Sequence, residues 1–195
     1  MDENLIITEK EMANANMVSK PYDSVFHMLF RDKNYLLQMY QALHPEDMET
    51  NVEDLKILFY NKAVLKDFVN DLSFLAKDKI LILFEAQSTE CGNMPLRLLI
   101  YLAKSLIDYI AEKGYNLFRK NPVELPKLEL YVLYTCEVEQ RVERISFAET
   151  YFPKGICPVD LKVNVLYGDE KQSIYRFRGA TDKAFQILDS LLKQR

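Results

Sequence analysis

Apolar residues follow a helical period near the start of the chain. From Tyr22 onward they recur at the three- and four-residue spacing of one helix face, and Pro45 closes this region. Asp23 or Ser24 can cap the start of the helix. The residues before it, 1–19, are polar and weakly periodic, which indicates a short N-terminal arm. The apolar residues of this predicted helix are Val25, Phe26, Leu29, Phe30, Leu36, Leu37, Tyr40 and Leu43.

Short apolar runs predict five strands in the rest of the chain. The second and third runs form a predicted hairpin that turns at Lys77–Asp78. A loop or short helix around 146–152 separates the last two strands. The five runs are 55–60, 67–76, 79–88, 127–136 and 160–168.

Two further helices are predicted between and after these strands. The segment that begins with Asn93 and Pro95 and ends at Gly114 carries both the start and the stop signals of a long helix. A last amphipathic helix is expected from about Thr181 to Lys193. The order of elements predicts an α/β fold with a central mixed sheet flanked by helices, and not a doubly wound sheet.

Polar residues interrupt the predicted hairpin at Asp71, Glu85 and Gln87. Because strand side chains alternate, Glu85 and Gln87 project from one face and Ala86 from the other. The midpoint of 71 and 85 is residue 78, inside the predicted turn, so antiparallel pairing puts Asp71 opposite or diagonal to Glu85. Two facing carboxylates in an apolar hairpin need a compensating cation or a shared proton.

A divalent metal ion is one such cation. Mg²⁺ binds one or two carboxylates together with waters and other oxygens, which matches Asp71, Glu85 and the backbone carbonyl of Ala86. The alternative is that the acids lie on a solvated sheet face or pair with a lysine. The spacing of these residues alone does not separate the two interpretations.

The long helix adds a polar stripe that could face the hairpin. Arg97, Tyr101, Lys104 and Asp108 have the spacing of one helix face and are set among leucine and isoleucine residues. The alternative is the solvated face of an amphipathic helix. That alternative fits Arg97 and Tyr101 less well, because they lie nearest the end of the preceding strand.

Composition and charge restrict the class of protein. The 195 residues suit a single domain, which we place at 20–195. The net charge of −4 argues against a protein that coats nucleic acid through bulk electrostatics, so any contact with DNA must be local. Three cysteines without CxxC spacing fit a reducing cytoplasm. No apolar run reaches the roughly 18 residues of a membrane span, and no common nucleotide-binding, hydrolase or zinc-protease motif occurs.

Several segments together resemble the PD-(D/E)xK nuclease superfamily, and within it the recombination-promoting, transposase-like nucleases. NDLSFLAKDKILILFEAQST followed by NMPLRLLIYLA resembles the family's aspartate strand, its E-x-Q-S and its M-P-x-R-x-x-x-Y helix. YDSVFHMLFRDKNYLL, LPKLELYVLYTCE and DLKVNVLY resemble its opening helix and later strands, so the match covers about residues 20–168. Thr135 and Cys136 depart from the asparagine and glycine of the family pattern, and its long C-terminal region is missing or reduced.

The resemblance implies a Mg²⁺- or Mn²⁺-dependent DNA endonuclease with a restriction-endonuclease-like αβββαβ core. In this family Asp71 and Glu85 would hold the metal, and Gln87 takes the position usually given to a lysine. Arg97 or Lys104 would then supply positive charge to the phosphate, positioned by Tyr101. Asp23 either hydrogen-bonds a water of the metal or is a plain helix cap. The expected partner is DNA, with a homodimer left open.

Two other classes remain compatible with the sequence. The first is a non-catalytic DNA-binding or recombination accessory domain that keeps the fold, which the exchange of lysine for Gln87 suggests. The second is an interaction module of a mobile-element or defence system, in which the two acids have a structural role.

Overall fold

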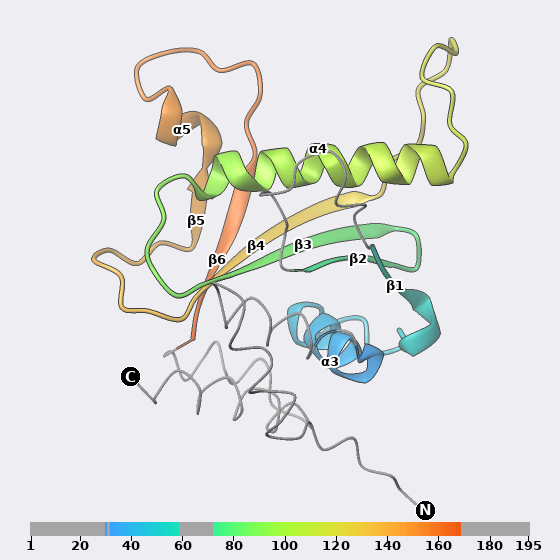
Figure 1. The fold of residues 1–195 in the computed structure, drawn as a ribbon, viewed down its shortest axis with the longest axis horizontal. Coiled ribbons are helices and arrows are strands. Elements are labelled where there is room, and N and C mark those ends of the chain that lie inside the picture. Colours follow the sequence, from blue (N-terminus) through green and yellow to red (C-terminus); the bar gives the residue numbers. More distant parts are fainter. Residues whose placement is uncertain (1–29, 31, 59–71, 169–195) are drawn as a thin grey trace, which may run out of the picture.

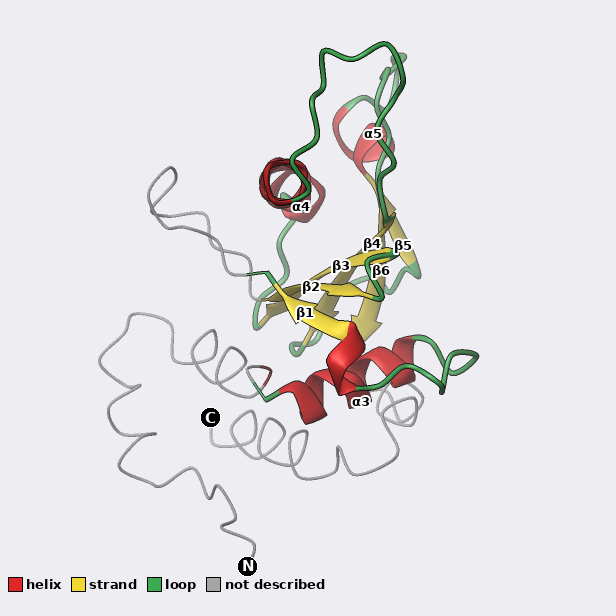
Figure 2. Ribbon diagram, turned by 90° about the vertical axis from the view of Figure 1, so that its right-hand side faces the viewer, coloured by secondary structure: helices red, strands yellow, loops and turns green. Residues whose placement is uncertain are grey.

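A six-stranded mixed sheet lies between helices on its two faces (Figures 1 and 2). The structure, a computed structural model, describes residues 30, 32–58 and 72–168. Within these ranges the strands follow the order β1-β2-β3-β4-β6-β5. The strands are β1 (Leu55–Ile57), β2 (Leu72–Ala76), β3 (Ile80–Gln87), β4 (Lys127–Tyr134), β5 (Arg144–Ser146) and β6 (Lys162–Tyr167). The predicted N-terminal arm and C-terminal helix, together with Asp23 and Asp71, lie outside the described residues.

The hairpin of β2 and β3 forms where it was predicted. Leu72 pairs with Phe84 and Ala76 with Ile80, so residue 78 is the midpoint of the ladder. Lys77 and Asp78 both have positive φ, at 51° and 55°, and the amide of Lys79 donates to the carbonyl of Ala76 at 2.9 Å. Positive φ at two successive turn positions matches the right-handed twist of the flanking strands.

The long helix α4 (Met94–Glu112) connects β3 to β4, which run parallel. Both end signals were predicted correctly: Asn93 precedes the helix, and Gly114 follows it with φ of 64°. The amides of Gly114 and Tyr115 donate to carbonyls of the last helical turn, at 3.1 and 3.0 Å. A glycine in this conformation ends a helix without steric cost.

The first predicted helix is interrupted. Phe30 is helical, but Asp32 has extended backbone, and α3 (Lys33–Leu43) begins after it. The side chain of Asp32 accepts a hydrogen bond from the amide of Asn34 at 2.8 Å, so it caps α3 instead of continuing an earlier turn. The prediction of one continuous helix was therefore wrong at Asp32. The predicted end was correct, because α3 stops two residues before Pro45.

Two short elements, the edge strand β5 and a 3-10 turn before β1, were not predicted from the sequence. The edge strand β5 pairs antiparallel with β6, and the helix α5 (Phe147–Tyr151) follows it directly. The short-helix alternative for this segment is thus confirmed, while β5 was missed because its three residues carry no apolar alternation. A 3-10 turn, η1 (Val52–Asp54), precedes β1 and is capped by Asn51. No helix in the described ranges is long and apolar enough to span a bilayer.

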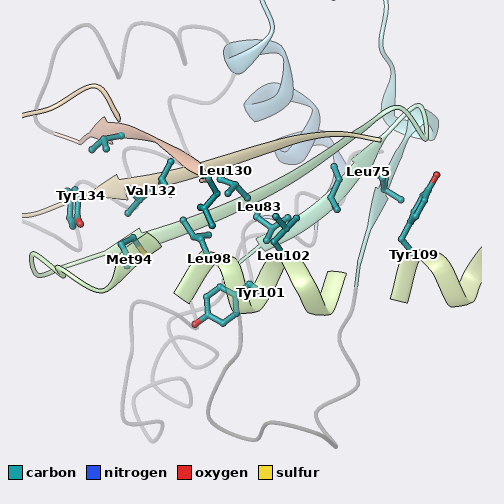
Figure 3. Packing of buried hydrophobic residues seen from close by; sticks show 14 of the residues in the cluster. Leu75, Leu83, Met94, Leu98, Tyr101, Leu102, Tyr109, Leu130, Val132 and Tyr134 are labelled. Carbon is teal, nitrogen blue, oxygen red and sulfur yellow. The ribbon is translucent and has the colours of Figure 1, made fainter. Parts of the chain in front are cut away.

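Apolar side chains fill both sides of the sheet. On one side α3 covers residues of β1, β2 and β3, including Phe74, Ile82 and Phe84. On the other side Leu98 and Leu102 of α4 point toward the strands (Figure 3). The alternation of β3 therefore sends Ile82 and Phe84 toward α3, and sends Leu81, Leu83 and the next odd-numbered residues toward α4.

Candidate functional site

Glu85 is a charged residue in the apolar layer under α4. It follows Leu81 and Leu83 on the same face of β3, and its side chain is only 1 % exposed. β3 is a central strand between β2 and β4, so Glu85 does not lie at an open edge of the sheet. A buried carboxylate is costly unless it is paired and hydrogen-bonded.

Arg97 provides the compensating charge. It stands one turn into α4, and its Nη2 forms an ion pair with Oε1 of Glu85. Its Nη1 donates to Oε1 of Gln87 at 3.1 Å. Its Nε and Nη2 also lie 3.4 and 3.3 Å from the hydroxyl of Tyr101, one helical turn further on. Four of the six residues predicted to be catalytic are thus in one cluster: Glu85, Gln87, Arg97 and Tyr101.

The guanidinium of Arg97 carries its charge at every accessible pH. Burial by itself lowers the pKa of Arg97, but the Glu85 carboxylate and the Tyr101 hydroxyl raise it by more, so the net shift is upward. The Glu85 charge is therefore matched by a permanent cation of the same chain. The sequence analysis required a compensating partner for the buried acid, and Arg97 is one such partner. Glu85 therefore does not lie on a solvated sheet face, and the cation described beside it is an arginine and not a lysine.

Gln87 links the other members of the cluster. Its Nε2 donates to the carbonyl of Ala86 at 3.0 Å and lies 3.3 Å from Oε1 of Glu85. Its backbone carbonyl accepts from the amide and hydroxyl of Thr135, at 2.9 and 3.1 Å. The last residue of β3 is thus fixed to the end of β4, and its amide group is directed toward the carboxylate.

The cluster lies at the carboxyl ends of the parallel strands, beneath the N-terminal part of α4. β3, β4 and β6 run parallel and end together at Gln87, Tyr134 and Tyr167. The hydroxyl of Tyr134 donates to the carbonyl of Cys91 in the loop between β3 and α4, at 3.3 Å. Burial raises the pKa of Tyr134, so this hydroxyl stays protonated as a donor. Open α/β sheets commonly bind ligands outside these strand ends.

The described part of the predicted metal site offers two oxygen donors, the Glu85 carboxylate and the Ala86 carbonyl. Mg²⁺ accepts such a set when waters and further oxygens complete its coordination. Both donors already accept hydrogen bonds from side chains of the cluster. Within residues 30, 32–58 and 72–168, no three acidic, histidine or cysteine side chains come together as ligands. The donor chemistry fits the ion, but a metal would have to compete with Arg97 for Glu85.

The polar stripe of α4 divides into two parts. Tyr101 is 3 % exposed and belongs to the cluster, whereas Asp108 is exposed and Lys104 is half-buried. Arg97 and Tyr101, the two residues that fit a solvated face less well, hydrogen-bond to each other, and Arg97 also bonds to Gln87.

A second polar network lies on the opposite face of the sheet and was not identified from the sequence. Nε2 of His44, at the end of α3, lies 2.9 Å from Glu129 of β4, and Nδ1 lies 3.0 Å from Glu46. Tyr131 and Lys127 complete the surroundings of Glu129, at 2.8 and 2.7 Å. The single signal in the sequence is a glutamate in the middle of an apolar strand.

The same network continues toward the turn of the hairpin. The ring of Tyr40 stacks on that of His44 with centroids 4.8 Å apart, and its hydroxyl donates to Asp47 at 2.9 Å. Asp47 also pairs with Lys77 at 3.0 Å and accepts from Thr50 at 2.8 Å. These contacts tie the end of α3 to the β2–β3 turn.

Comparison with protein-family models, with curated proteins and with solved structures gives no match to this chain.

Proposed function

We propose that the chain is a metal-dependent DNA endonuclease that hydrolyses phosphodiester bonds, with a restriction-endonuclease-like core and a role in recombination or mobile elements. The observation that supports this is the register of the hairpin. Within the described residues the ladder ends with Leu72 paired to Phe84, and this is the register from which the sequence predicts that Asp71 and Glu85 face each other. Glu85, Gln87 and Arg97 meet at the adjacent strand end.

In this proposal Asp71, Glu85 and the Ala86 carbonyl would hold Mg²⁺ or Mn²⁺, and Asp23 would hydrogen-bond a water of the metal. The bound ion supplies polarisation of the scissile phosphate and activation of a water. Gln87 cannot carry charge, so its amide orients that water or donates a hydrogen bond to a phosphate oxygen.

Arg97 has a double task in the same mechanism. Without substrate it neutralises Glu85, with Tyr101 holding the guanidinium at its flank. With Glu85 engaged by an ion, the guanidinium of Arg97 would be free to hold the phosphate through two parallel hydrogen bonds. There it would stabilise the charge that develops in the transition state.

A second candidate is a catalytically reduced DNA-binding or interaction module that keeps the nuclease fold. The observation in its favour is the ion pair itself, because Arg97 already provides Glu85 with a cation. Gln87 in place of a lysine points in the same direction. In this alternative the cluster is structural and needs no metal.

Cleavage of supercoiled plasmid separates the two candidates. The wild type, Asp71→Ala and Glu85→Gln are incubated with Mg²⁺, with Mn²⁺ and with EDTA, and Asp108→Asn serves as a control for loss of an acid on the exposed side of α4. We expect nicking or linearisation by the wild type and the control only, and only with metal. Equal activity of wild type and Asp71→Ala, or no activity above EDTA in any protein, contradicts the nuclease proposal. In the latter case, retained binding of the folded protein to DNA would support the second candidate.

A further inference from the structure

The side of α4 that points away from the sheet is apolar. Helical spacing places five residues opposite the sheet-facing Leu98 and Leu102, and we call these five the outer stripe. Ile107 is 66 % exposed and Leu96 is 40 % exposed. The outer stripe consists of Leu96, Ile100, Ala103, Ile107 and Ala111. α4 thus presents apolar residues on two opposite sides, and only one of these sides faces the sheet.

No helix or strand of the described ranges covers the outer stripe. Figures 1 and 2 show α4 on the outside of the sheet, with the loop 113–126 rising beyond its C-terminal end. Exposed isoleucine and leucine aligned along a helix mark a surface for association, whereas scattered single exposures do not. The stripe therefore calls for a partner with a matching apolar face.

We propose that the partner is a second copy of this chain, with the two α4 helices packed antiparallel about a two-fold axis at Ala103. Ala103 lies midway along Met94–Glu112, and its small side chain lets two helices approach closely at the crossing. The rotation brings Leu96 between the partner's Ile107 and Ala111, and Ile100 between the partner's Ala103 and Ile107. Every such pair is apolar, which is the self-complementarity that an isologous interface requires.

The charges at the two ends of α4 favour this direction of packing. Arg119 and Lys120 are exposed in the loop after the helix. Glu90 and Glu139 are exposed in the loops near its start, where the amide of Glu139 lies 3.4 Å from Oε2 of Glu90. Antiparallel packing sets the basic loop of one copy against the acidic loops of the other at both ends. Parallel packing would instead set like charges together, which opposes association.

The interface does not depend on the proposed nuclease function, because it uses the outer side of α4 whereas Glu85 lies on its inner side. It can therefore be tested without metal or DNA. The first experiment measures the mass of the full chain in solution by sedimentation and light scattering. We expect a dimer for the wild type.

Ile107→Asp tests the outer stripe directly, because the two-fold axis introduces the charge twice, once on each side of Ala103. We expect its dissociation constant to rise by at least about 100-fold, the size of effect at a central interface residue. Ile156→Asp is the matched control, since Ile156 is 98 % exposed in the loop that follows α5. A monomeric wild type overturns the proposal, as does a dimer that survives Ile107→Asp. If the wild type is monomeric and Ile107→Asp is unfolded, another part of the chain covers the outer stripe, and the proposal is overturned as well.

A cysteine at the axis tests the geometry independently of affinity. Ala103→Cys should form an intermolecular disulfide on mild oxidation, because a residue on the two-fold axis faces its own copy within the distance that a disulfide spans. Ala111→Cys, also exposed on α4 but away from the axis, should give no more cross-linking than the wild type with its three native cysteines. Equal cross-linking of both variants overturns the antiparallel arrangement.

Charge reversal tests the direction of packing. Arg119→Glu combined with Lys120→Glu should weaken the dimer about tenfold, and adding Glu90→Lys and Glu139→Lys should restore it. A fourfold variant that is weaker than the double variant would contradict the pairing of these loops.

Discussion

At the scale of single residues, the central feature is a buried acid whose counter-charge comes from another element. Glu85 is 1 % exposed and Arg97 is 24 % exposed, so the pair is shielded from solvent mainly on the carboxylate side. Removing one partner of such a pair costs much more than the pair contributes net, because the remaining charge is left in a poor environment. The arginine is therefore a requirement for folding as well as a candidate for substrate binding.

Arg97→Met tests this directly. The variant keeps an unbranched apolar stem but leaves Glu85 without this cation, so we expect the free energy of unfolding to fall by about 3 kcal/mol. Urea denaturation monitored by circular dichroism gives the value. Lys56→Met removes the cation of an exposed pair with Glu112 and should cost less than about 1 kcal/mol. Equal losses in the two variants would show that burial does not set the cost at Glu85.

At the scale of elements, α4 depends on its last turn. Gly114 has φ of 64°, and an added Cβ would meet nothing within 4 Å. Gly114→Ala therefore isolates the backbone cost, and we expect a loss of about 1 kcal/mol in the free energy of unfolding. Gly92 and Gly155 also have open space around them but no positive φ, so their alanine variants should be no less stable than the wild type. A similar loss in all three would point to chain flexibility and not to the left-handed backbone.

The α3 network makes a pH dependence of stability testable. The ammonium of Lys77, with the hydroxyls of Thr50 and Tyr40, holds the pKa of Asp47 well below its usual range. For Glu129, burial raises the pKa, but Lys127 and the other neighbours lower it by more. A carboxyl whose pKa is depressed in the folded state stabilises the protein above its unfolded pKa and loses this effect as the pH falls through the folded value.

We therefore expect the melting temperature to fall as the pH drops below about 4, the range of an unfolded carboxyl group. Asp47→Asn should be less stable than the wild type at neutral pH and should lose less on acidification. Thermal melts between neutral and strongly acidic pH measure both effects. Curves that stay parallel for the two proteins would exclude Asp47 as a source of the dependence.

At the scale of the whole molecule, the sequence predicted what depends on neighbours along the chain. The alternation in β3, the hairpin midpoint at residue 78 and the boundaries of α4 all follow from local patterns, and the structure has each of them. The strand β5 has only three residues and exists through pairing with β6, so no local pattern marks it. The break at Asp32 was missed because a capping residue lies inside an apolar period.

The candidate site shows the same limit. Arg97 and Glu85 are 12 residues apart, and helix spacing together with strand alternation was enough to place them near each other. His44 and Glu129 are 85 residues apart, and only the packing of α3 onto the sheet brings them into contact. Sequence patterns could indicate that polar residues gather under α4, but not that an arginine would provide the charge that a metal had been expected to supply.

Metal binding should be visible as stability of the whole chain. A divalent ion that binds only the folded protein stabilises it by about 2.7 kcal/mol at 100 times its dissociation constant. For a domain of this size, that raises the melting temperature by several degrees. We expect such a rise for the wild type in millimolar Mn²⁺, and a smaller one in Mg²⁺.

Two variants locate the ion. Asp71→Asn should melt at or above the wild-type temperature without metal, because one of two acids predicted to face each other is neutral, and it should show no rise with Mn²⁺. Arg97→Met should start lower but rise more than the wild type, since the ion no longer competes with a guanidinium for Glu85. An equal rise in wild type and Asp71→Asn would place the ion elsewhere. A larger response to Mn²⁺ in Arg97→Met, lost again when Asp71→Asn is added, would mean that arginine and metal serve the same carboxylate in turn, as the proposed mechanism requires.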